Sequence, residues 1–310
     1  MEEKIEIMNL LQSKQVLEHE LQSLAYGSVE IRENESNKYI YVHYREDGVA
    51  LTKYVGEYSD ELYNLVLNNS IKAKQLKKQI RGIIKKLKQL NYTEEELSEK
   101  VEQNIDFAKR HLVDTIYKQA ILEGVATTFA DTESIIEGGK VNNMTSEDIL
   151  KIVNLKHAWE FILNKNVILS DTNFALLCEI NKMVEEGFYY TAGKVRNTPV
   201  TIGGTTWKPD LPIESVIKEE LEEIFSKELD DIDRAIELLL YTMKKQVFID
   251  GNKRTAVIYS NHYLISKGKG IIAIPAELTE EFKDLLIPYY EEKDEKQIKK
   301  FIKGKCYMNI

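Results

Sequence analysis

The chain has 310 residues, of which 43% are apolar and 30% are charged, a composition typical of a soluble globular protein. It lacks the run of about 18 apolar residues that a membrane-spanning helix needs, and its acidic start is unlike a signal peptide, so we expect a cytoplasmic protein. The net charge of −9 disfavours a general nucleic-acid-binding protein. The two cysteines, Cys178 and Cys306, have no metal-like spacing, which argues against a disulfide scaffold or a zinc site.

The first quarter of the chain predicts a small β-sheet followed by a long helix. Two β-rich runs, Tyr39–Arg45 and Leu51–Val55, flank Asp47-Gly48, and Asp-Gly between such runs is a strong hairpin signal. We therefore expect a hairpin or a three-stranded sheet near residues 28–56. From Ser59 to about Leu90, apolar residues recur at spacings of three and four, which predicts a long amphipathic helix.

A second long helix is predicted from the capping-box pattern of Thr93 and Glu96 to about Leu122. The two helices would form an antiparallel hairpin that carries the sheet, so residues 1–124 are predicted to be an N-terminal arm. Lys72–Lys88 is strongly basic and could meet an acidic partner or nucleic acid. The simpler interpretation is a solvated helix face that the acidic residues 94–102 balance.

Residues 125–310 are predicted to form a second, mainly helical domain with short connections. Thr145 and Ser170 are expected to cap helices that end near Asn164 and Glu186. The further helices are expected at 213–226, 230–246, 255–266, 277–293 and 295–302, with an extended segment at 271–275. The β-branched runs around Gly203-Gly204 predict a β-hairpin within residues 199–209.

The stretch from Gln246 to Ala256 places an acid, a glycine, an amide and two bases around one turn before a helix. The backbone N–H groups from Gly251 to Lys253 should then be the unpaired donors of a helix N-terminus, which is a natural phosphate site. Asp250 offers a carboxylate to Mg²⁺, and Arg254 offers a forked donor to phosphate oxygens. The pattern therefore predicts a site for nucleotide phosphates.

This stretch resembles the core motif of the Fic/Doc family, His-x-Phe-x-Asp-Gly-Asn-(Gly/Lys)-Arg. The matching residues are Phe248, Asp250, Gly251, Asn252, Lys253 and Arg254. The resemblance implies a mainly helical Fic-type bundle with a β-hairpin flap, ATP or another nucleotide as ligand, and Mg²⁺ on the aspartate. It also implies that residues 248 and 251–254 form the nucleotide-binding loop, and that AMP is transferred to a hydroxyl of a protein substrate.

The chain departs from the family motif at the position of the catalytic histidine, which Gln246 occupies. Histidine titrates near neutral pH and is the family's general base, whereas an amide has no useful basicity, so activity should be impaired or altered. Lys253 and Val257 stand where the AMP-transferring branch has Gly and a second Arg, and this is closer to the Doc form, which transfers phosphate. The alternatives are therefore an inactive pseudoenzyme that serves as an interaction module, and a Doc-like protein kinase.

Two further segments resemble family elements, so that the resemblance covers roughly residues 125–305. The hairpin at 199–209 corresponds to the flap that pairs with an extended target, which makes Thr201, Ile202 and Gly203 candidate docking residues. Glu137 and Gly138 resemble the end of the family's inhibitory helix, although the usual partner arginine is missing at Val257. A similar Glu-Gly pair at residues 123–124 is predicted to be an ordinary helix C-terminus.

Overall fold

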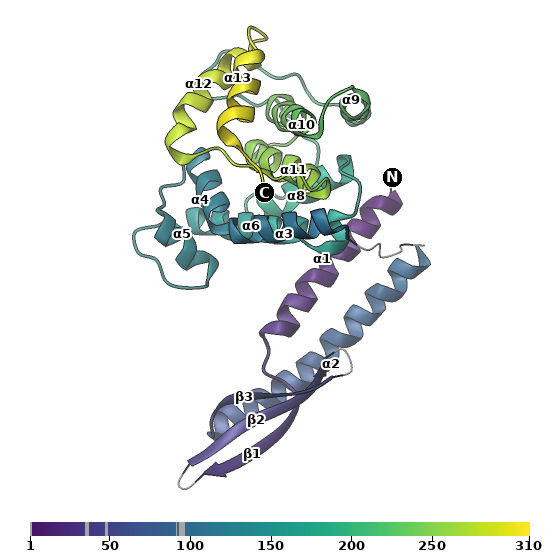
Figure 1. Ribbon diagram of the computed structural model, residues 1–310, viewed down its shortest axis with the longest axis vertical. Coiled ribbons are helices and arrows are strands. Elements are labelled where there is room, and N and C mark those ends of the chain that lie inside the picture. Colours follow the sequence, from purple (N-terminus) through teal and green to yellow (C-terminus); the bar gives the residue numbers. More distant parts are fainter. Residues whose placement is uncertain (1, 35–36, 47–48, 91, 93–96) are drawn as a thin grey trace. The chain divides into compact units, whose positions relative to one another are not determined.

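The computed structural model describes residues 2–34, 37–46, 49–90, 92 and 97–310, and the chain forms two compact units (Figure 1). One unit consists mainly of Asn9–Thr93 and the other mainly of Glu94–Ile310. The predicted turn at Asp47-Gly48 and the predicted capping box of Thr93 and Glu96 lie outside the described residues.

The N-terminal unit is a three-stranded antiparallel sheet packed against a long helix. Its elements are α1 (Glu2–Ser23), β1 (Ser28–Asn34), β2 (Asn37–Glu46), β3 (Val49–Glu57) and α2 (Asp60–Gln89), with strand order β1-β2-β3. Ile40 and Val42 of β2 are fully buried and pack with Val66 of α2. The side-chain oxygen of Ser59 accepts a hydrogen bond from the N–H of Leu62, which sets the start of α2. The predicted sheet and long helix are thus confirmed, whereas α1 was not predicted.

The C-terminal unit is almost entirely helical. Its helices are α3 (Glu99–Arg110), α4 (Leu112–Leu122), α5 (Phe129–Ile136), α6 (Ser146–Ile162), α7 (Lys165–Ile168), α8 (Phe174–Val184), α9 (Glu214–Ser226), α10 (Asp231–Lys245), α11 (Asn252–Ser266), α12 (Thr279–Tyr290) and α13 (Lys296–Phe301). Two short strands, β4 (Ile271–Ile272) and β5 (Tyr307–Met308), form an antiparallel pair. None of the helices in the described ranges is long and apolar enough to cross a membrane.

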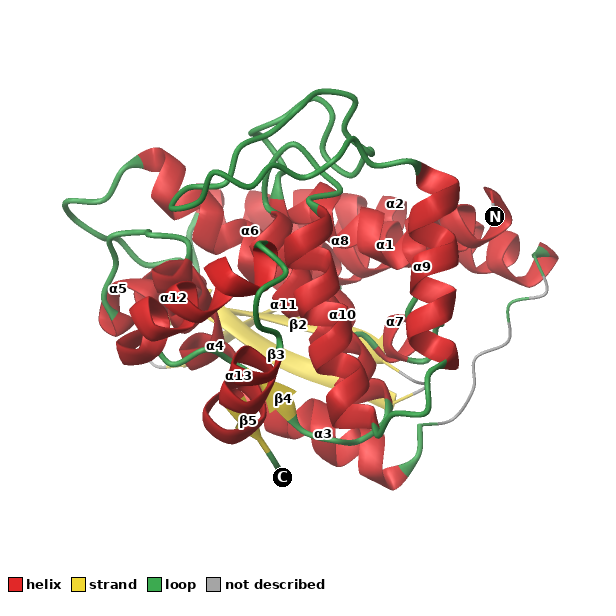
Figure 2. Ribbon diagram, turned by 90° about the horizontal axis from the view of Figure 1, so that it is seen from above, coloured by secondary structure: helices red, strands yellow, loops and turns green. Residues whose placement is uncertain are grey.

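Helix α11 is the central element of this unit and is surrounded by α10, α8, α3 and α6 (Figure 2). It is buried on all sides, so its polar residues must find partners inside the protein. Asn261 donates to the carbonyls of Val257 and Ile272 at 2.8 Å each. His262 is within 2.8 Å of Thr172 Oγ1 and 2.9 Å of the Val167 carbonyl, and burial lowers its pKa to about 4. These bonds fix the position of the helix that carries the motif.

The structure corrects three details of the sequence prediction. The helix expected to run to Leu122 is divided at His111 into α3 and α4. Helix α8 begins after Asn173, whose side chain accepts from the N–H of Leu176, and not after Ser170. Residues 199–209 contain a turn at Gly203-Gly204 but no paired strands, so the expected flap is an irregular loop.

Candidate functional site

The motif turn reverses the chain between α10 and α11. Helix α10 ends at Lys245, and Gln246 adopts a left-handed conformation with φ of 48°. Its side-chain N–H group donates to the Met243 carbonyl at 2.7 Å, which closes the end of the helix. Gly251, with φ of 72°, then turns the chain into α11.

Asn252 holds the turn together from inside. Its Oδ1 accepts from the N–H of Phe248 at 3.0 Å, and its Nδ2 donates to the Phe248 carbonyl at 2.8 Å and to Gln246 Oε1 at 3.1 Å. The amide of Asn181 on α8 adds a bond to the Asp250 carbonyl at 3.0 Å. The ring of Phe248 is buried, so this residue shapes the loop through its backbone and the core. The turn is therefore rigid before any ligand binds.

The start of α11 has the features of an anion site. No side chain caps this helix, and the Gly251 N–H donates to Oδ1 of the preceding Asp250 at 2.7 Å. The N–H groups of the first helical turn point out of the helix end, where the helix dipole is positive. Asp250 is about half exposed, with a side-chain accessibility of 51%, and its second carboxylate oxygen, Oδ2, lies 3.8 Å from Arg254 Nη2.

Arg254 lies beneath the turn and is surrounded by carboxylates. Only 3% of its side chain is exposed, and its Nη2 lies 2.7 Å from Oε1 of Glu185 and 3.8 Å from Oδ2 of Asp250. Its Nε is 3.5 Å from Glu123 Oε2, and Lys253 Nζ is 3.4 Å from Glu123 Oε1. Nε and Nη1 of Arg254 have no partner with hydrogen-bond geometry among the described residues. Buried guanidinium donors of this kind normally have an acceptor, which an incoming anion can supply.

Glu185 is the most buried carboxylate of the site, with 2% of its side chain exposed. Burial raises its pKa to about 7, the Arg254 guanidinium opposes this shift, and the charges of Asp250 and Glu123 add to it. A Cβ atom on Gly251 would lie 2.3 Å from Glu185 Oε1. The turn therefore needs glycine at 251 both for its left-handed backbone and for the close approach of Glu185.

The chain was compared with known proteins by family and by fold. Residues 171–264 match the model of the Fic/DOC family. A Fic-domain-containing signaling protein from Bacteroides thetaiotaomicron shares 19% identity and a TM-score of 0.51, covering 61% of this chain and 75% of that one. Residues 134–508 of Fic-1 from C. elegans share 17% identity and a TM-score of 0.53, covering 79% and 73%. A Fic family protein from Desulfovibrio desulfuricans shares 13% identity and a TM-score of 0.53, covering 68% and 73%.

This chain contains a Fic/DOC family domain. The family match includes the whole motif turn and α11 up to Leu264, and the structural matches show that the fold around them is Fic-like at low sequence identity. No curated protein matches the chain.

Glu123, which precedes the residues matched by the Fic/DOC model, forms ion pairs with Lys253 and Arg254 of the motif, and Glu137 does not. Glu123 caps the C-terminus of α4 and is followed by Gly124 with φ of 76°, so the predicted helix end at 123–124 is confirmed. Glu137 ends α5, is exposed, and forms no ion pair with any described residue. The carboxylate that contacts Lys253 and Arg254 thus lies at the end of α4, whereas the family pattern had suggested the one at the end of α5.

The loop in the flap position of the Fic/DOC domain is held at both ends. The buried Arg196 donates to three carbonyls, those of Gln246 at 2.6 Å, Thr198 at 2.8 Å and Asp210 at 2.6 Å, and so ties the base of the loop to the motif turn. The ring of Trp207 stacks on Tyr290 of α12 at 5.8 Å. Trp207 is thus an anchor of the loop.

The exposed part of this loop contains the predicted docking residues. Thr201 and Gly203 are exposed and Ile202 is partly buried. No backbone hydrogen bond of these three residues to another described backbone group is present. Their peptide groups are therefore open for pairing with another chain.

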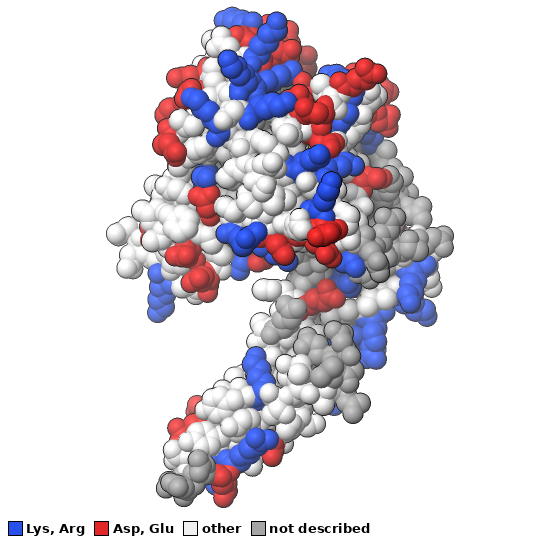
Figure 3. Space-filling model, viewed as in Figure 1, with Lys and Arg blue, Asp and Glu red and all other residues white. Residues whose placement is uncertain are grey.

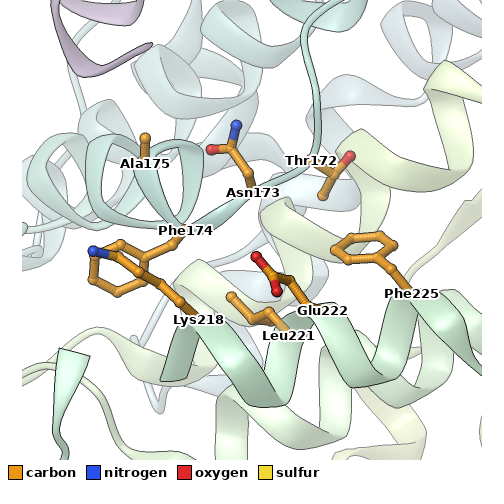
Figure 4. A pocket seen from close by; sticks show the side chains of 8 residues that line it. All are labelled: Thr172, Asn173, Phe174, Ala175, Lys218, Leu221, Glu222 and Phe225. Atoms are coloured by element: carbon orange, nitrogen blue, oxygen red, sulfur yellow. The ribbon is translucent and has the colours of Figure 1, made fainter. Parts of the chain in front are cut away.

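A pocket of about 300 Å³ lies elsewhere in the unit, between the start of α8 and α9 (Figure 4). It is lined by Thr172, Asn173, Phe174, Ala175, Lys218, Leu221, Glu222 and Phe225. No motif residue lines it. Among the described residues, no group of three or more His, Cys, Asp or Glu side chains could hold a metal, so Asp250 is the candidate ligand on its own.

Several residues of the site could not be recognised from the sequence alone. Glu185 and Asn181 come from α8, Glu123 from α4 and Arg196 from the loop segment, and packing alone brings them to the motif. A possible signal was Glu123-Gly124, a second copy of the Glu-Gly pair, which sequence reasoning assigned to helix termination only.

Proposed function

We propose that the Fic/DOC domain of this chain binds ATP with Mg²⁺ and transfers AMP from ATP to a hydroxyl group of a protein substrate, with activity that Gln246 impairs or alters. Fic proteins typically catalyse this reaction, and the family generally uses ATP and Mg²⁺. The cytoplasmic location expected from the sequence is part of the proposal.

The observation that carries the proposal is the arrangement of Arg254 under the uncapped start of α11. Two of its nitrogens, Nε and Nη1, are buried without a hydrogen-bond acceptor among the described residues, and Arg254 belongs to the first turn of α11, which has no side-chain cap. A phosphate group would supply acceptors to both sets of donors. Lys253, whose side chain is 32% exposed, adds a second cation for the phosphates.

Asp250 is suited to hold Mg²⁺. This ion usually binds proteins through one or two carboxylates and completes its shell with water and substrate phosphates. Asp250 is half exposed at the mouth of the turn, and Arg254 beneath it can face the same phosphates. The metal would neutralise phosphate charge next to three carboxylates.

The transfer step needs an acceptor for the proton of the attacking hydroxyl, since the new bond forms at the α-phosphorus as pyrophosphate leaves. The position of the family histidine holds Gln246, and both polar atoms of its amide are used inside the turn, by the Met243 carbonyl and by Asn252. The residue therefore braces the turn and cannot accept the proton. General-base catalysis is typically worth about 10²- to 10⁴-fold in rate, which is the deficit we expect.

The protein substrate is proposed to dock on Thr201, Ile202 and Gly203. β-Strand addition needs free backbone groups, and these residues have them. Because the loop is fixed by Arg196 and Trp207 at its ends, a docked segment would be held in a constant position relative to the turn.

An assay with α-labelled and γ-labelled ATP tests this function. The natural chain and Gln246→His are incubated with Mg²⁺ and a mixture of candidate proteins. We expect α-label transfer to rise about 10²- to 10⁴-fold in Gln246→His. Equal transfer by both chains would show that Gln246 does not limit the reaction, and transfer of the γ-label would identify a Doc-like kinase.

The second candidate function is a pseudoenzyme that binds nucleotide and acts as an interaction module. The bonded amide of Gln246 favours it, because this residue contributes to the structure of the turn and not to proton transfer. Nucleotide binding without label transfer by the natural chain would support this function.

We further propose that a glutamate restrains the site, either Glu137 as expected from the family pattern or Glu123 as favoured by the contacts. The Glu123 carboxylate contacts both cations of the motif, with Oε1 3.4 Å from Lys253 Nζ and Oε2 3.5 Å from Arg254 Nε. A nucleotide phosphate would have to compete with its carboxylate for these cations.

A further inference from the structure

Helix α2 has one buried edge and one open face. Its buried residues Val66, Ala73, Ile80 and Leu87 recur every seven positions, the spacing of a coiled-coil seam. Helix α1 runs beside it (Figure 1), and Lys72 Nζ of α2 lies 2.5 Å from Glu20 Oε1 of α1. The apolar side of α2 is thus used within its own unit, and its opposite side faces solvent.

The open face carries a row of cations, which we call the basic stripe. Its members are Lys74, Lys78, Arg81, Lys85 and Lys88. Their spacings of four, three, four and three residues place them on one side of the helix over about 21 Å, at a rise of 1.5 Å per residue. All five are exposed, and Lys and Arg gather where α2 lies at the right of Figure 3.

The basic stripe is not neutralised by the chain itself. Between Leu62 and Gln89 the helix has no Asp or Glu. None of the five stripe residues forms an ion pair with a described residue, whereas Lys72, at the edge of the seam, does. The sequence suggested that a solvated helix would be balanced by nearby acids, but repulsion among like charges at these spacings destabilises a helix unless an outside anion compensates.

The surroundings of the stripe identify the kind of anion. Along the stripe itself, from Lys74 to Lys88, Ile84 is the one large apolar side chain that is exposed, and the exposed Leu65, Leu67 and Ile71 lie in the turns of α2 before it. The stripe therefore lacks the continuous apolar surface that a membrane-bound helix inserts. Gln75, Gly82 and Gln89 lie next to the cations and present amides or open backbone. A regular row of one charge sign on a straight helix matches a polymer with regularly repeated negative charges.

We propose that the open face of α2 binds duplex DNA, with the helix in the major groove and the basic stripe on the phosphates. The major groove of B-DNA admits an α-helix, whereas that of duplex RNA is too deep and narrow. This inference is independent of the nucleotide site. It concerns a helix that is strongly positive between residues 62 and 89, in a chain whose overall net charge is −9.

Gly82 supports a close approach at this face. Glycine inside a helix costs roughly 0.5–1 kcal/mol relative to alanine. A Cβ atom at residue 82 would meet nothing within 4 Å, so no contact within the described chain requires glycine there. A backbone that must come near another molecule is a common reason for such a residue.

Fluorescence anisotropy with a labelled duplex of about 20 base pairs and the full chain tests the proposal. Five neutralised phosphates predict a slope of about −4.5 for log affinity against log salt, or a loss of about 500-fold between 50 and 200 mM salt. Replacing all five stripe residues with Gln should weaken binding at least 100-fold. The double variant Lys78→Gln and Lys85→Gln should reduce the magnitude of the slope by about 1.8. It provides the test if the fivefold variant does not fold.

The matched control changes the same charge elsewhere. Lys100, Lys109, Lys269, Lys296 and Lys300 are exposed cations of the C-terminal unit, and their replacement with Gln should leave DNA binding within about twofold. Absence of DNA binding by the natural chain at 50 mM salt would overturn the proposal. So would equal loss in both fivefold variants, tighter binding of duplex RNA, or displacement of DNA by polyglutamate of equal charge.

Discussion

Arg254 brings one positive charge into a site where Asp250, Glu185 and Glu123 all lie within 4 Å of its nitrogens. Without a ligand, the excess of negative charge around Arg254 favours protonation of one carboxyl group. We expect this group to be Glu185, because it is the most buried of the three and burial raises its pKa. With Mg²⁺ and phosphate present, the guanidinium would gain acceptors that it now lacks.

Replacement of Glu185 by Gln should change how stability depends on pH. In the unfolded chain this carboxyl has a pKa near 4.5, and burial raises the folded value to about 7. The folded state therefore binds the extra proton between these pH values, and stability falls as pH rises, with the full cost above about pH 7. That cost is on the order of 3 kcal/mol at 1.36 kcal/mol per pKa unit.

Urea unfolding of the natural chain, Glu185→Gln and the exposed neighbour control Glu186→Gln at pH 5 to 8 checks this prediction. The decline between pH 5 and 7 should disappear in Glu185→Gln and persist in Glu186→Gln. Parallel curves for all three chains would show that Glu185 does not titrate in this range.

Gly251→Ala should destabilise the protein more than Gly138→Ala. Both residues have positive φ, 72° and 78°, so both alanines meet the same backbone strain of about 1–2 kcal/mol. Only at 251 does the added Cβ also approach Glu185 Oε1, to 2.3 Å, whereas nothing lies within 4 Å at 138. Thermal unfolding should rank natural, Gly138→Ala and Gly251→Ala in falling order, and equal melting points for the two variants would be contrary evidence.

At the scale of elements, local capping signals located the starts of some helices, although α8 is capped by Asn173 and not by Ser170 as predicted. Thr145 caps α6 as predicted, and Asp230, with which a helix was predicted to begin, is the cap of α10. Such starts are readable because an N-cap is a contact within four residues. The loop at 199–209 was mispredicted for the opposite reason. Two short strands are marginal alone, and Arg196 and Trp207 hold this loop by contacts distant in sequence.

The two candidate restraining helices, α4 and α5, can be distinguished by single substitutions. Glu123→Gln removes the carboxylate that contacts Lys253 and Arg254, so ATP affinity should rise severalfold. Glu137→Gln, at an exposed helix end, should have little effect. Calorimetric titration with Mg·ATP measures both, and the reverse order would restore Glu137 as the restraining residue.

At the scale of the whole molecule, the composition indicated a globular protein with a net negative charge. It did not indicate where along the chain the positive charges lie. The acidic total of −9 disfavoured nucleic acid as a partner, yet residues 62–89 carry cations without a single acid. The site shows the same limit, since the motif was readable as eleven consecutive residues while Glu185 and Glu123 join it only through the packing of α8 and α4 around α11. The motif could therefore be recognised from the sequence, whereas the carboxylates that pack against it could not.

Calorimetry of Mg·ATP binding tests the central claim that the motif turn holds nucleotide phosphates. The natural chain is compared with Arg254→Gln and with the double variant Arg254→Gln and Glu185→Gln, in which no buried carboxylate is left without its guanidinium. We predict that the natural chain binds Mg·ATP and that both variants bind it at least tenfold more weakly. Circular dichroism should show that both variants are folded. Absence of binding by the natural chain, or equal affinity in all three, would contradict the account.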